Sequence, residues 1–349
     1  MALNMSQAFV LCVIAIVSTF AYRWLYQHGP PPPSPHPPAV ERPAQPHKTF
    51  RVRGVPREWD SDRLQVFLGE GDSVPTVWSL AQEIHGRSLS ATVTYRNPPA
   101  ALCAVPTKIW TRPLPKPPET PAARLDSVTV DADFIGMTTL FAPLDDDNHK
   151  VDVIAISGLG GHAFGSFKER GGEYMWLRDA LPHDLHSEGT NRPMARLITY
   201  GYESAVADSQ SIQNLEDLAT AFHSSLLPLA SSPQTKPIIL IAHSLGGLIV
   251  KQLLISLARS KNEDDKKIIQ AVYGIVFFGV PHDGMDISSL IPMVGGGPNA
   301  LLVQSISHIN SQILSMQQRE FHTALGAEGD SEIVCFYETQ RSPTARQVG

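Results

Sequence analysis

The sequence predicts an α/β domain with a mostly parallel sheet over residues 125–349, and two patterns carry that prediction. Strand-like and helix-like segments alternate along this part of the chain. The strand-like segments are continuous apolar runs, such as "VDVIAIS" and "PIILIAH", rather than runs of alternating polarity. Continuous apolar strands that alternate with helices are typical of parallel sheets covered by helices on both faces.

The elements of this domain are expected in a regular order. Strands are predicted at residues 151–157, 195–202, 237–243, 271–280 and 332–339. Helices are predicted between them at residues 173–181, 214–230 and 246–260. Each assignment rests on the period of its apolar residues and on its length.

Length and charge limit the functions that the chain can have. Its 349 residues give room for about two domains. The formal net charge of −6 offers no basic surface for nucleic acid. The three cysteines, Cys12, Cys103 and Cys335, are too widely spaced to indicate a disulfide framework or a metal site. We therefore expect no metal, no cofactor and no nucleic-acid partner.

The N-terminal segment Ala8–Tyr26 is apolar and nearly free of charge. As a helix it would be about 28 Å long, close to the thickness of a bilayer core. We predict a single-pass membrane anchor at residues 1–28 and a proline-rich linker at residues 29–47; a cleaved signal and a targeting presequence are the alternatives. The basic residues that follow predict that the body of the protein lies on the cytosolic or equivalent side of the endoplasmic reticulum or mitochondrion.

Residues 48–110 are predicted to form a separate small α/β module. Their β-α-β-β rhythm resembles ferredoxin-like and RNA-recognition-type modules. The third strand lacks the stacking aromatics and basic residues that single-stranded RNA binding needs. We expect a structural or protein-contact module, and the proline-rich residues 111–124 are predicted to link it to the next domain.

A serine follows one of the predicted buried strands, in "ILIAHSLGG". Ser244 lies in the turn between this strand and a helix, which is the setting of a nucleophile elbow. Such a turn is tight and needs small residues on both sides of the nucleophile. The residues around the serine are Ala242, His243, Gly246 and Gly247. The alternative is a serine that only caps the helix.

A glycine-rich loop follows the strand at residues 151–157. Its "GLGG" stretch makes Leu159 a candidate backbone donor to an oxyanion, and Leu245, after the serine, is the second donor. The loop also fits a dinucleotide fingerprint through Gly158, Gly160 and Ala163. That alternative expects an acidic residue about 20 positions later, at the end of the next strand, and none is found there.

Several motifs in this part of the chain resemble a known family. "GLGGHAFGSF", "RLITYGYES", "AHSLGGLIVKQLL", "VFFGVPHDGMD" and "FYET" occur in this order. They resemble fungal α/β-hydrolase domains related to the serine-active-site-containing protein and to GPI inositol-deacylases. The resemblance covers about residues 125–349. It implies the α/β-hydrolase fold, Ser244 as nucleophile, and the hydrolysis of an ester in membrane lipid or GPI-lipid metabolism.

The remaining members of a catalytic triad are less clear. Glu338, at the end of the last predicted strand, is the candidate acid, with Asp283 and Asp286 as alternatives. In the resembling family the histidine comes from a later turn, but the chain ends eleven residues after Glu338. We therefore expect a C-terminally truncated sheet without a clear catalytic histidine. A catalytically inactive interaction module is the alternative function.

Overall fold

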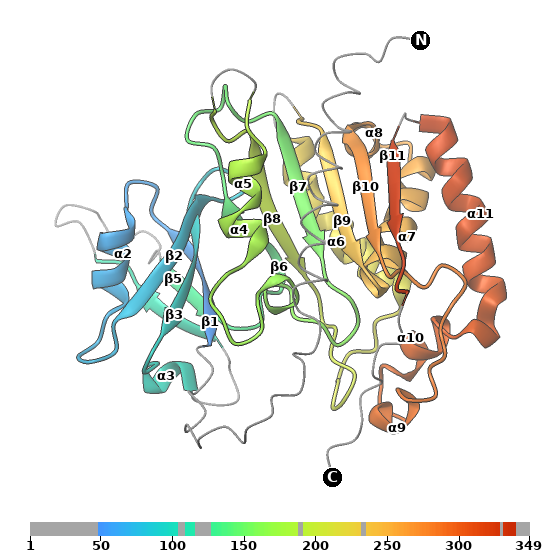
Figure 1. The fold of residues 1–349 in the computed structure, drawn as a ribbon, viewed down its shortest axis with the longest axis horizontal. Helices are drawn as coiled ribbons and strands as arrows, with labels where there is room; N and C mark the ends of the chain where they lie inside the picture. Colours follow the sequence, from blue (N-terminus) through green and yellow to red (C-terminus); the bar gives the residue numbers. More distant parts are fainter. Residues whose placement is uncertain are drawn as a thin grey trace, which may run out of the picture.

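The computed structural model describes residues 48–103, 109–115, 127–187, 191–231, 235–328 and 331–339. These residues form two sheets that lie side by side (Figure 1). The first sheet has five antiparallel strands in the order β2-β3-β1-β5-β4. The second has six strands in the order β11-β10-β9-β7-β8-β6, all parallel except β6.

The small module begins with the predicted β-α-β-β order. Its elements are β1 (Thr49–Val55), α2 (Ser61–Leu68), β2 (Pro75–Gln82), β3 (Leu89–Tyr95), α3 (Ala100–Cys103), β4 (Ile109–Pro113) and β5 (Ser127–Asp131). The side chain of Asp60 begins α2 by accepting a hydrogen bond from the Arg63 N–H. The ferredoxin-like resemblance is not confirmed, because α3 has only four residues and a fifth strand, β5, lies beside β1.

The module is longer than the predicted range 48–110. Strand β4 extends into residues 111–124, the range that was predicted to be a linker, and β5 belongs to the small sheet rather than to the larger domain. The physical reason is burial: Val128 and Val130 are fully buried against the apolar side chains of this module. Five-residue strands carry too little periodicity to be recognised from sequence.

The larger domain contains all five predicted strands. Its strands are β6 (Gly136–Phe141), β7 (Val151–Ile156), β8 (Ala195–Gly201), β9 (Ile238–His243), β10 (Val272–Phe278) and β11 (Glu332–Phe336). Its helices are η1 (Gly165–Phe167), α4 (Trp176–Asp179), α5 (Leu181–Asp184), α6 (Leu215–Ala230), α7 (Leu245–Arg259), α8 (Glu263–Ala271), α9 (Ile291–Val294), α10 (Ala300–Ser305), η2 (His308–Asn310) and α11 (Ser311–Glu328). The helix predicted at residues 173–181 is instead two short helices, with Pro182 in the first turn of α5.

Helices cover both faces of the larger sheet, as the apolar strands predicted. All six residues of β7 are buried. Val153 and Ala155 pack into the layer that contains α4 and α5, whereas Ile154 and Ile156 pack into the layer of α6, α7 and α11. The carboxyl ends of the parallel strands β7, β9 and β10 come together at one edge of this sheet.

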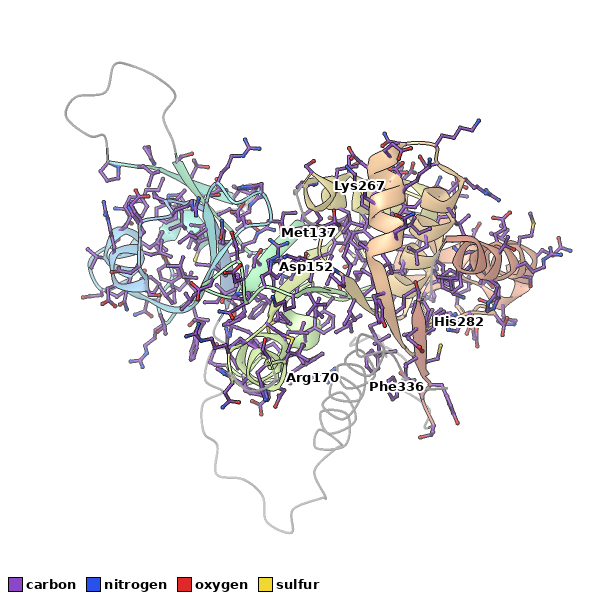
Figure 2. The ribbon with its side chains drawn as sticks, turned by 90° about the horizontal axis from the view of Figure 1, so that it is seen from above. Met137, Asp152, Arg170, Lys267, His282 and Phe336 are labelled. Carbon is purple, nitrogen blue, oxygen red and sulfur yellow. The ribbon has the colours of Figure 1, made fainter. Side chains whose placement is uncertain are left out.

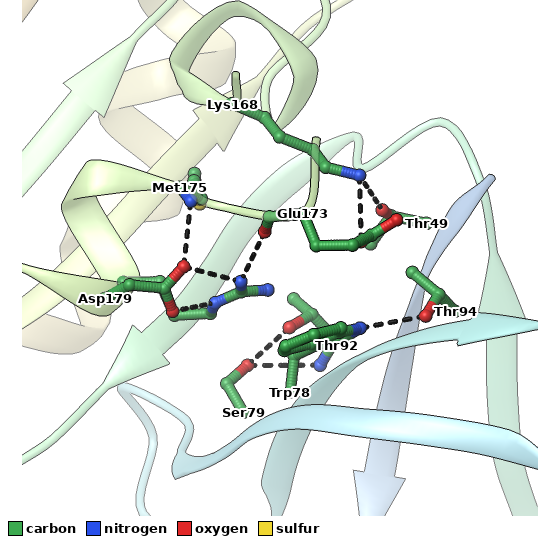
Figure 3. A network of polar contacts seen from close by, with 10 residues as sticks. Thr49, Trp78, Ser79, Thr92, Thr94, Lys168, Glu173, Met175 and Asp179 are labelled. Carbon is green, nitrogen blue, oxygen red and sulfur yellow. Dashed lines mark hydrogen bonds and ion pairs between the residues drawn. The ribbon is translucent and has the colours of Figure 1, made fainter. Parts of the chain in front are cut away.

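Polar contacts fasten the small module to the larger domain. The Arg51 guanidinium, 2% exposed, pairs with Asp131 at 2.8 Å and donates to the Ile135 carbonyl and the Thr138 hydroxyl of the larger domain. Figure 3 shows a second set of contacts, in which Lys168 reaches Thr49 of β1 at 3.3 Å. Together they hold the two sheets in one arrangement.

The described ranges contain no helix that is long and apolar enough to cross a membrane. The prediction of a single-pass membrane protein therefore finds no support in the part of the chain that the structure describes. The segment Ala8–Tyr26, on which that prediction rested, lies outside the described residues, as do the predicted anchor and the first linker.

Candidate active site

Ser244 has the backbone geometry expected of a nucleophile elbow. It lies between β9 and α7 with φ 51° and ψ −124°. Its N–H donates to the Phe278 carbonyl of β10 at 2.9 Å, and its carbonyl accepts from the Gly247 N–H at 3.0 Å. A positive φ costs a non-glycine residue about 1–3 kcal/mol and persists where the surroundings impose it, often at functional positions.

Glycines surround this serine because no side chain would fit. A Cβ on Gly158 would lie 2.7 Å from the Ser244 Cβ and 2.9 Å from the His243 Nδ1. A Cβ on Gly246 would lie 2.7 Å from the Ser157 carbonyl oxygen. The glycine-rich loop therefore packs directly against the serine turn, which brings together the two motifs that the sequence singled out.

The same packing places both candidate oxyanion donors beside the serine. Leu245 is the first residue of α7, where backbone N–H groups have no partner inside the helix. Leu159 follows Gly158, and hydrogen bonds from Gly160 to the Ser204 carbonyl and from Gly161 to the Gly158 carbonyl fix its loop. Leu159 and Leu245 therefore both lie on segments that adjoin Ser244, and their role as oxyanion donors stays a prediction.

Of the three candidate acids, the structure brings Glu338 to the end of β9. Its Oε1 lies 3.8 Å from the position that a Cβ on Gly279 would occupy. The His243 side chain is exposed, yet crowding by protein atoms lowers the pKa of its imidazole, and the Glu338 carboxylate opposes that shift. Glu338 therefore lies within electrostatic reach of the residue before the nucleophile.

The two alternative acids face other groups. Asp283 acts electrostatically on Lys251 and His282, in the layer that contains α7 and α11. The Asp286 carboxylate is exposed and accepts a hydrogen bond from the Ser288 N–H at 2.9 Å, which lowers its pKa. Neither contact connects these carboxylates to the serine turn.

No histidine in the described ranges forms a hydrogen bond with the Ser244 Oγ. His308 contacts the Met285 carbonyl, and His322 contacts Gln318 on α11. His282 lies beside α11 (Figure 2), with its ring against Phe277. Burial, reinforced by the charge of Lys251, lowers the His282 pKa to about 4.

Lys251 is a buried charged residue that the sequence did not reveal. It lies on α7, two turns after Ser244, and is 1% exposed. Its ammonium donates to the Gln318 side chain and lies 5.4 Å from the centre of the Phe321 ring. Burial lowers the pKa of Lys251 to about 8. The available signal was one lysine inside the apolar stretch "GGLIVKQLL".

A cavity of about 480 Å³ lies beside the glycine-rich loop. Its apolar lining comes from Leu159, Phe167, Trp176, Ile241 and Phe278. A larger hollow of about 860 Å³ is lined by β2, α4 and the segment after β6, none of which contributes to the serine turn. The lining of the smaller cavity includes two residues of the candidate site, Leu159 and His243.

Comparisons with known proteins identify one group of relatives. No family model matches the chain. The chain is 30% identical over 146 residues to Protein SERAC1 of Mus musculus and 28% identical over 157 residues to that of Bos taurus. These matches cover 39% and 40% of this chain but only 22% and 23% of the relatives, so the chain spans less than a quarter of their length.

Solved structures give more distant similarities. Phospholipase PlaB from Legionella pneumophila is 14% identical with a TM-score of 0.36, covering 54% of this chain and 39% of that one. The mature lipase BlEst2 from Bacillus licheniformis is 12% identical with a TM-score of 0.36, covering 57% of this chain and 70% of that one. These likenesses are too distant to carry a functional argument. The predicted relation to SERAC1 is confirmed, whereas the relations to fungal proteins and to GPI inositol-deacylases stay predictions.

Proposed function

We propose that this chain is a serine hydrolase that cleaves carboxylic esters through an acyl-enzyme on Ser244. The observation that carries the proposal is the positive φ of Ser244 in the turn between β9 and α7. A serine that merely capped a helix would accept a hydrogen bond from a backbone N–H of the first turn. Ser244 makes no such side-chain bond.

The proposed reaction has two steps. The Ser244 Oγ attacks the ester carbonyl and loses its proton to a base, while the Leu159 and Leu245 N–H groups stabilise the tetrahedral oxyanion. The alcohol leaves with a proton, and the acyl group remains on Ser244. Water then attacks the acyl-enzyme, which releases the carboxylic acid and restores the serine. The proposed base is a histidine imidazole, which takes the Ser244 proton and gives it to the leaving alcohol. The described residues do not supply it, and the resemblance to the hydrolase family leads us to expect it in a turn after Glu338. Glu338 is proposed as the acid that orients this imidazole.

The proposed substrate is an ester with an apolar acyl group, such as a lipid ester. The support for this class is the cavity of about 480 Å³ beside Leu159, which is large enough for a ligand of moderate size. Apolar side chains form one part of its lining, and the other part includes His162, Lys168 and Arg170. Its lining contains two aromatic rings from Phe167 and Trp176. Deacylation of a GPI lipid is a more specific form of this proposal.

A fluorophosphonate probe tests the nucleophile. The unsubstituted chain should be labelled, and Ser244→Ala should lose all labelling. Ser256→Ala is the matched control, because Ser256 is an exposed residue on the same helix. Equal labelling of the Ser244→Ala and Ser256→Ala variants would reject the assignment.

One observation favours a second function, that of an inactive hydrolase-fold interaction module. Within the described ranges the Ser244 Oγ has no hydrogen-bond partner that could activate it, and a serine hydroxyl without a base is a weak nucleophile at neutral pH. This candidate predicts a folded chain with no ester turnover and no labelling. Ser244-dependent hydrolysis of a short-chain nitrophenyl ester would exclude it.

A further inference from the structure

One stretch of the larger domain contains no charged residue. The 30 residues from Ile287 to Met316 include no Asp, Glu, Lys or Arg. They also include no Phe, Tyr or Trp. We call residues 287–316 the uncharged cap. In the structure it forms α9, α10, η2 and the first turns of α11.

Each part of the uncharged cap exposes at least one large apolar side chain, alongside uncharged polar residues such as Gln304 and Gln312. Inner side chains, including Leu302, Val303, Ile306 and Leu314, are buried in the core of the domain. The large apolar side chains on the outer side are Ile291 (58% exposed), Leu301 (69%), Ile309 (82%), Ile313 (57%) and Met316 (52%). Solvent-facing helix surfaces normally carry polar and charged residues, so this surface requires an explanation.

Helix α8, at the opposite end of the sheet (Figure 1), shows what a charged helix surface in this protein looks like. Its sequence "EDDKKIIQA" buries Ile268 and Ile269 and presents exposed ion pairs, such as Lys267 with Asp264 at 2.9 Å. The absence of charge from the uncharged cap is therefore not a general property of the chain.

The uncharged cap lies at the edge of the sheet that carries Ser244. It follows β10, and the Asn299 amide, 2% exposed, donates to the carbonyls of Ala205 and Val206, which follow β8. The His308 N–H donates to the carbonyl of Met285, which lies just before the cap, and this bond joins the two ends of the loop between them. Figure 1 shows α9, α10 and the start of α11 gathered at one corner of the domain, below the ends of β10 and β11.

We propose that the uncharged cap docks on the surface of an electrically neutral lipid bilayer. Leu301, Ile309 and Ile313 enter the boundary between headgroups and acyl chains, to a depth of about 5–10 Å. Met316 stays outside it, because it lies beside Arg259, Arg319 and Glu320. This is peripheral docking, and it needs no segment that crosses the bilayer. It goes beyond the proposed ester hydrolysis and does not depend on the chemistry of Ser244.

The composition of the cap favours lipid over a protein partner. Energetically dominant residues of protein interfaces are enriched in Trp, Tyr and Arg, and the cap contains none of them. It also has no lysine or arginine to attract anionic headgroups. The exposed side chains are flexible aliphatic groups on short elements joined by "VGGGP", which can adapt to a fluid surface.

Local fluorescence quenching tests the proposal on the full chain. Leu301→Trp and, as matched control, Val66→Trp on α2 of the small module each add one indole at an exposed apolar position. Vesicles of phosphatidylcholine brominated on the acyl chain should quench the indole at position 301 about twofold more than the one at position 66. The signal of the unsubstituted chain is subtracted, so other parts of the chain that enter the bilayer do not produce the difference.

A charge substitution gives the second readout. Leu301→Asp combined with Ile309→Asp should abolish the quenching of an indole introduced by Ile313→Trp, whereas Val66→Asp should leave that quenching unchanged. Quenching should not weaken when salt is raised or strengthen when anionic lipid is added. Equal quenching at positions 301 and 66 would overturn the proposal, and so would dependence on anionic lipid. A concentration-dependent dimer that shields position 301 from the vesicles would replace it by self-association.

Failure of this proposal is distinguishable from failure of the proposed function. The soluble fluorophosphonate probe reports on Ser244 without vesicles, so the Leu301→Asp, Ile309→Asp double variant should keep the labelling of the unsubstituted chain. Loss of labelling in that variant would show that the substitutions had damaged the site, and its quenching result would then count against the proposal.

Discussion

The amino ends and the carboxyl ends of the strands form two edges of the six-stranded sheet, and these two edges differ in their charged residues. At the amino edge, Asp152 of β7 is 2% exposed, and both of its carboxylate oxygens accept hydrogen bonds from Arg196 of β8, at 2.6 and 2.9 Å. His149 adds a third contact at 2.9 Å. The carboxyl edge carries the strained Ser244 and the Glu338 carboxylate, and the 30 residues without Asp, Glu, Lys or Arg follow β10 at this edge. Fixed charges are paired where the sheet begins, and the uncharged cap follows where it ends.

This difference separates architecture from chemistry. Burial opposes the ionisation of Asp152, but the hydrogen bonds from His149 and Arg196 outweigh it and lower the pKa of the carboxyl group. Such a network ties adjacent strands together, because each carboxylate oxygen already accepts a hydrogen bond from a neighbouring side chain. The carboxyl ends of strands in open α/β sheets are the usual place for ligands. Four predictions test the comparison, from the largest expected effect to the smallest.

The largest effect is expected at the amino edge. Asp152→Asn leaves the buried Arg196 guanidinium without its carboxylate and should lower the free energy of unfolding by about 3–5 kcal/mol. The folded variant should still be labelled at Ser244, because the two edges are independent. Urea denaturation and probe labelling measure the two quantities. A loss below about 1 kcal/mol would mean that the pair is not structural.

The second effect concerns the buried Lys251, whose hydrogen-bond partner, Gln318, is neutral. Its pKa is about 8 in the folded chain, against an ordinary value of 10.5. Between these pH values the unfolded chain binds more protons, so the free energy of unfolding should rise with pH, by about 3 kcal/mol in total. Below pH 8 both states hold the proton, and this contribution is constant.

Denaturation at several pH values checks the Lys251 prediction. Lys251→Met should remove the rise between pH 8 and pH 10.5. Lys267→Met, at an exposed lysine of α8, should keep it. If both variants behave like the unsubstituted chain, Lys251 does not titrate in this range.

The third effect lies at the carboxyl edge. Gly246→Ala would place a Cβ 2.7 Å from the Ser157 carbonyl oxygen and 2.9 Å from that of Ile156. These two backbone oxygens belong to the last residue of β7 and to the residue after it, and they cannot move freely. The free energy of unfolding of the variant should therefore fall by about 1–3 kcal/mol, and the fluorophosphonate probe should label it more slowly. Gly165→Ala, whose Cβ would meet His162 at an ordinary 3.4 Å, is the control. Equal behaviour of the two variants would contradict the tight elbow.

The smallest effect belongs to an exposed ion pair. Arg192 and Asp145 lie 3.6 Å apart, and both side chains are 64% exposed. Arg192→Ala should change the free energy of unfolding by less than about 0.5 kcal/mol, because water screens the pair. Comparing the stability losses of Arg192→Ala and Asp152→Asn shows how much more an ion pair contributes when it is buried. A loss comparable to that of Asp152→Asn would remove the distinction.

The sequence was most informative where a residue type has one physical role. The apolar runs identified all five predicted strands. A strand covered on both faces, such as β7, has to be apolar throughout, whereas β11 was found although it lies at the edge of the sheet and has no buried residue. Gly158 and Gly246 marked the close approach of the loop to the serine turn. The boundary after residue 110 was wrong, because β4 and β5 are short and their pairing with distant β1 leaves no local pattern. The burial of Lys251 depends on Gln318 and Phe321, which lie far away in the sequence.

The ion pair of Arg51 and Asp131 has a consequence for cooperativity. Arg51 belongs to the small sheet, but its guanidinium also donates to Ile135 and Thr138, where the larger sheet begins. If either sheet unfolded alone, the Arg51 guanidinium, which is now 2% exposed, would lose its hydrogen-bond partners. The two sheets should therefore unfold in one thermal transition. Stability of the small module then contributes to the stability of the distant turn that holds Ser244.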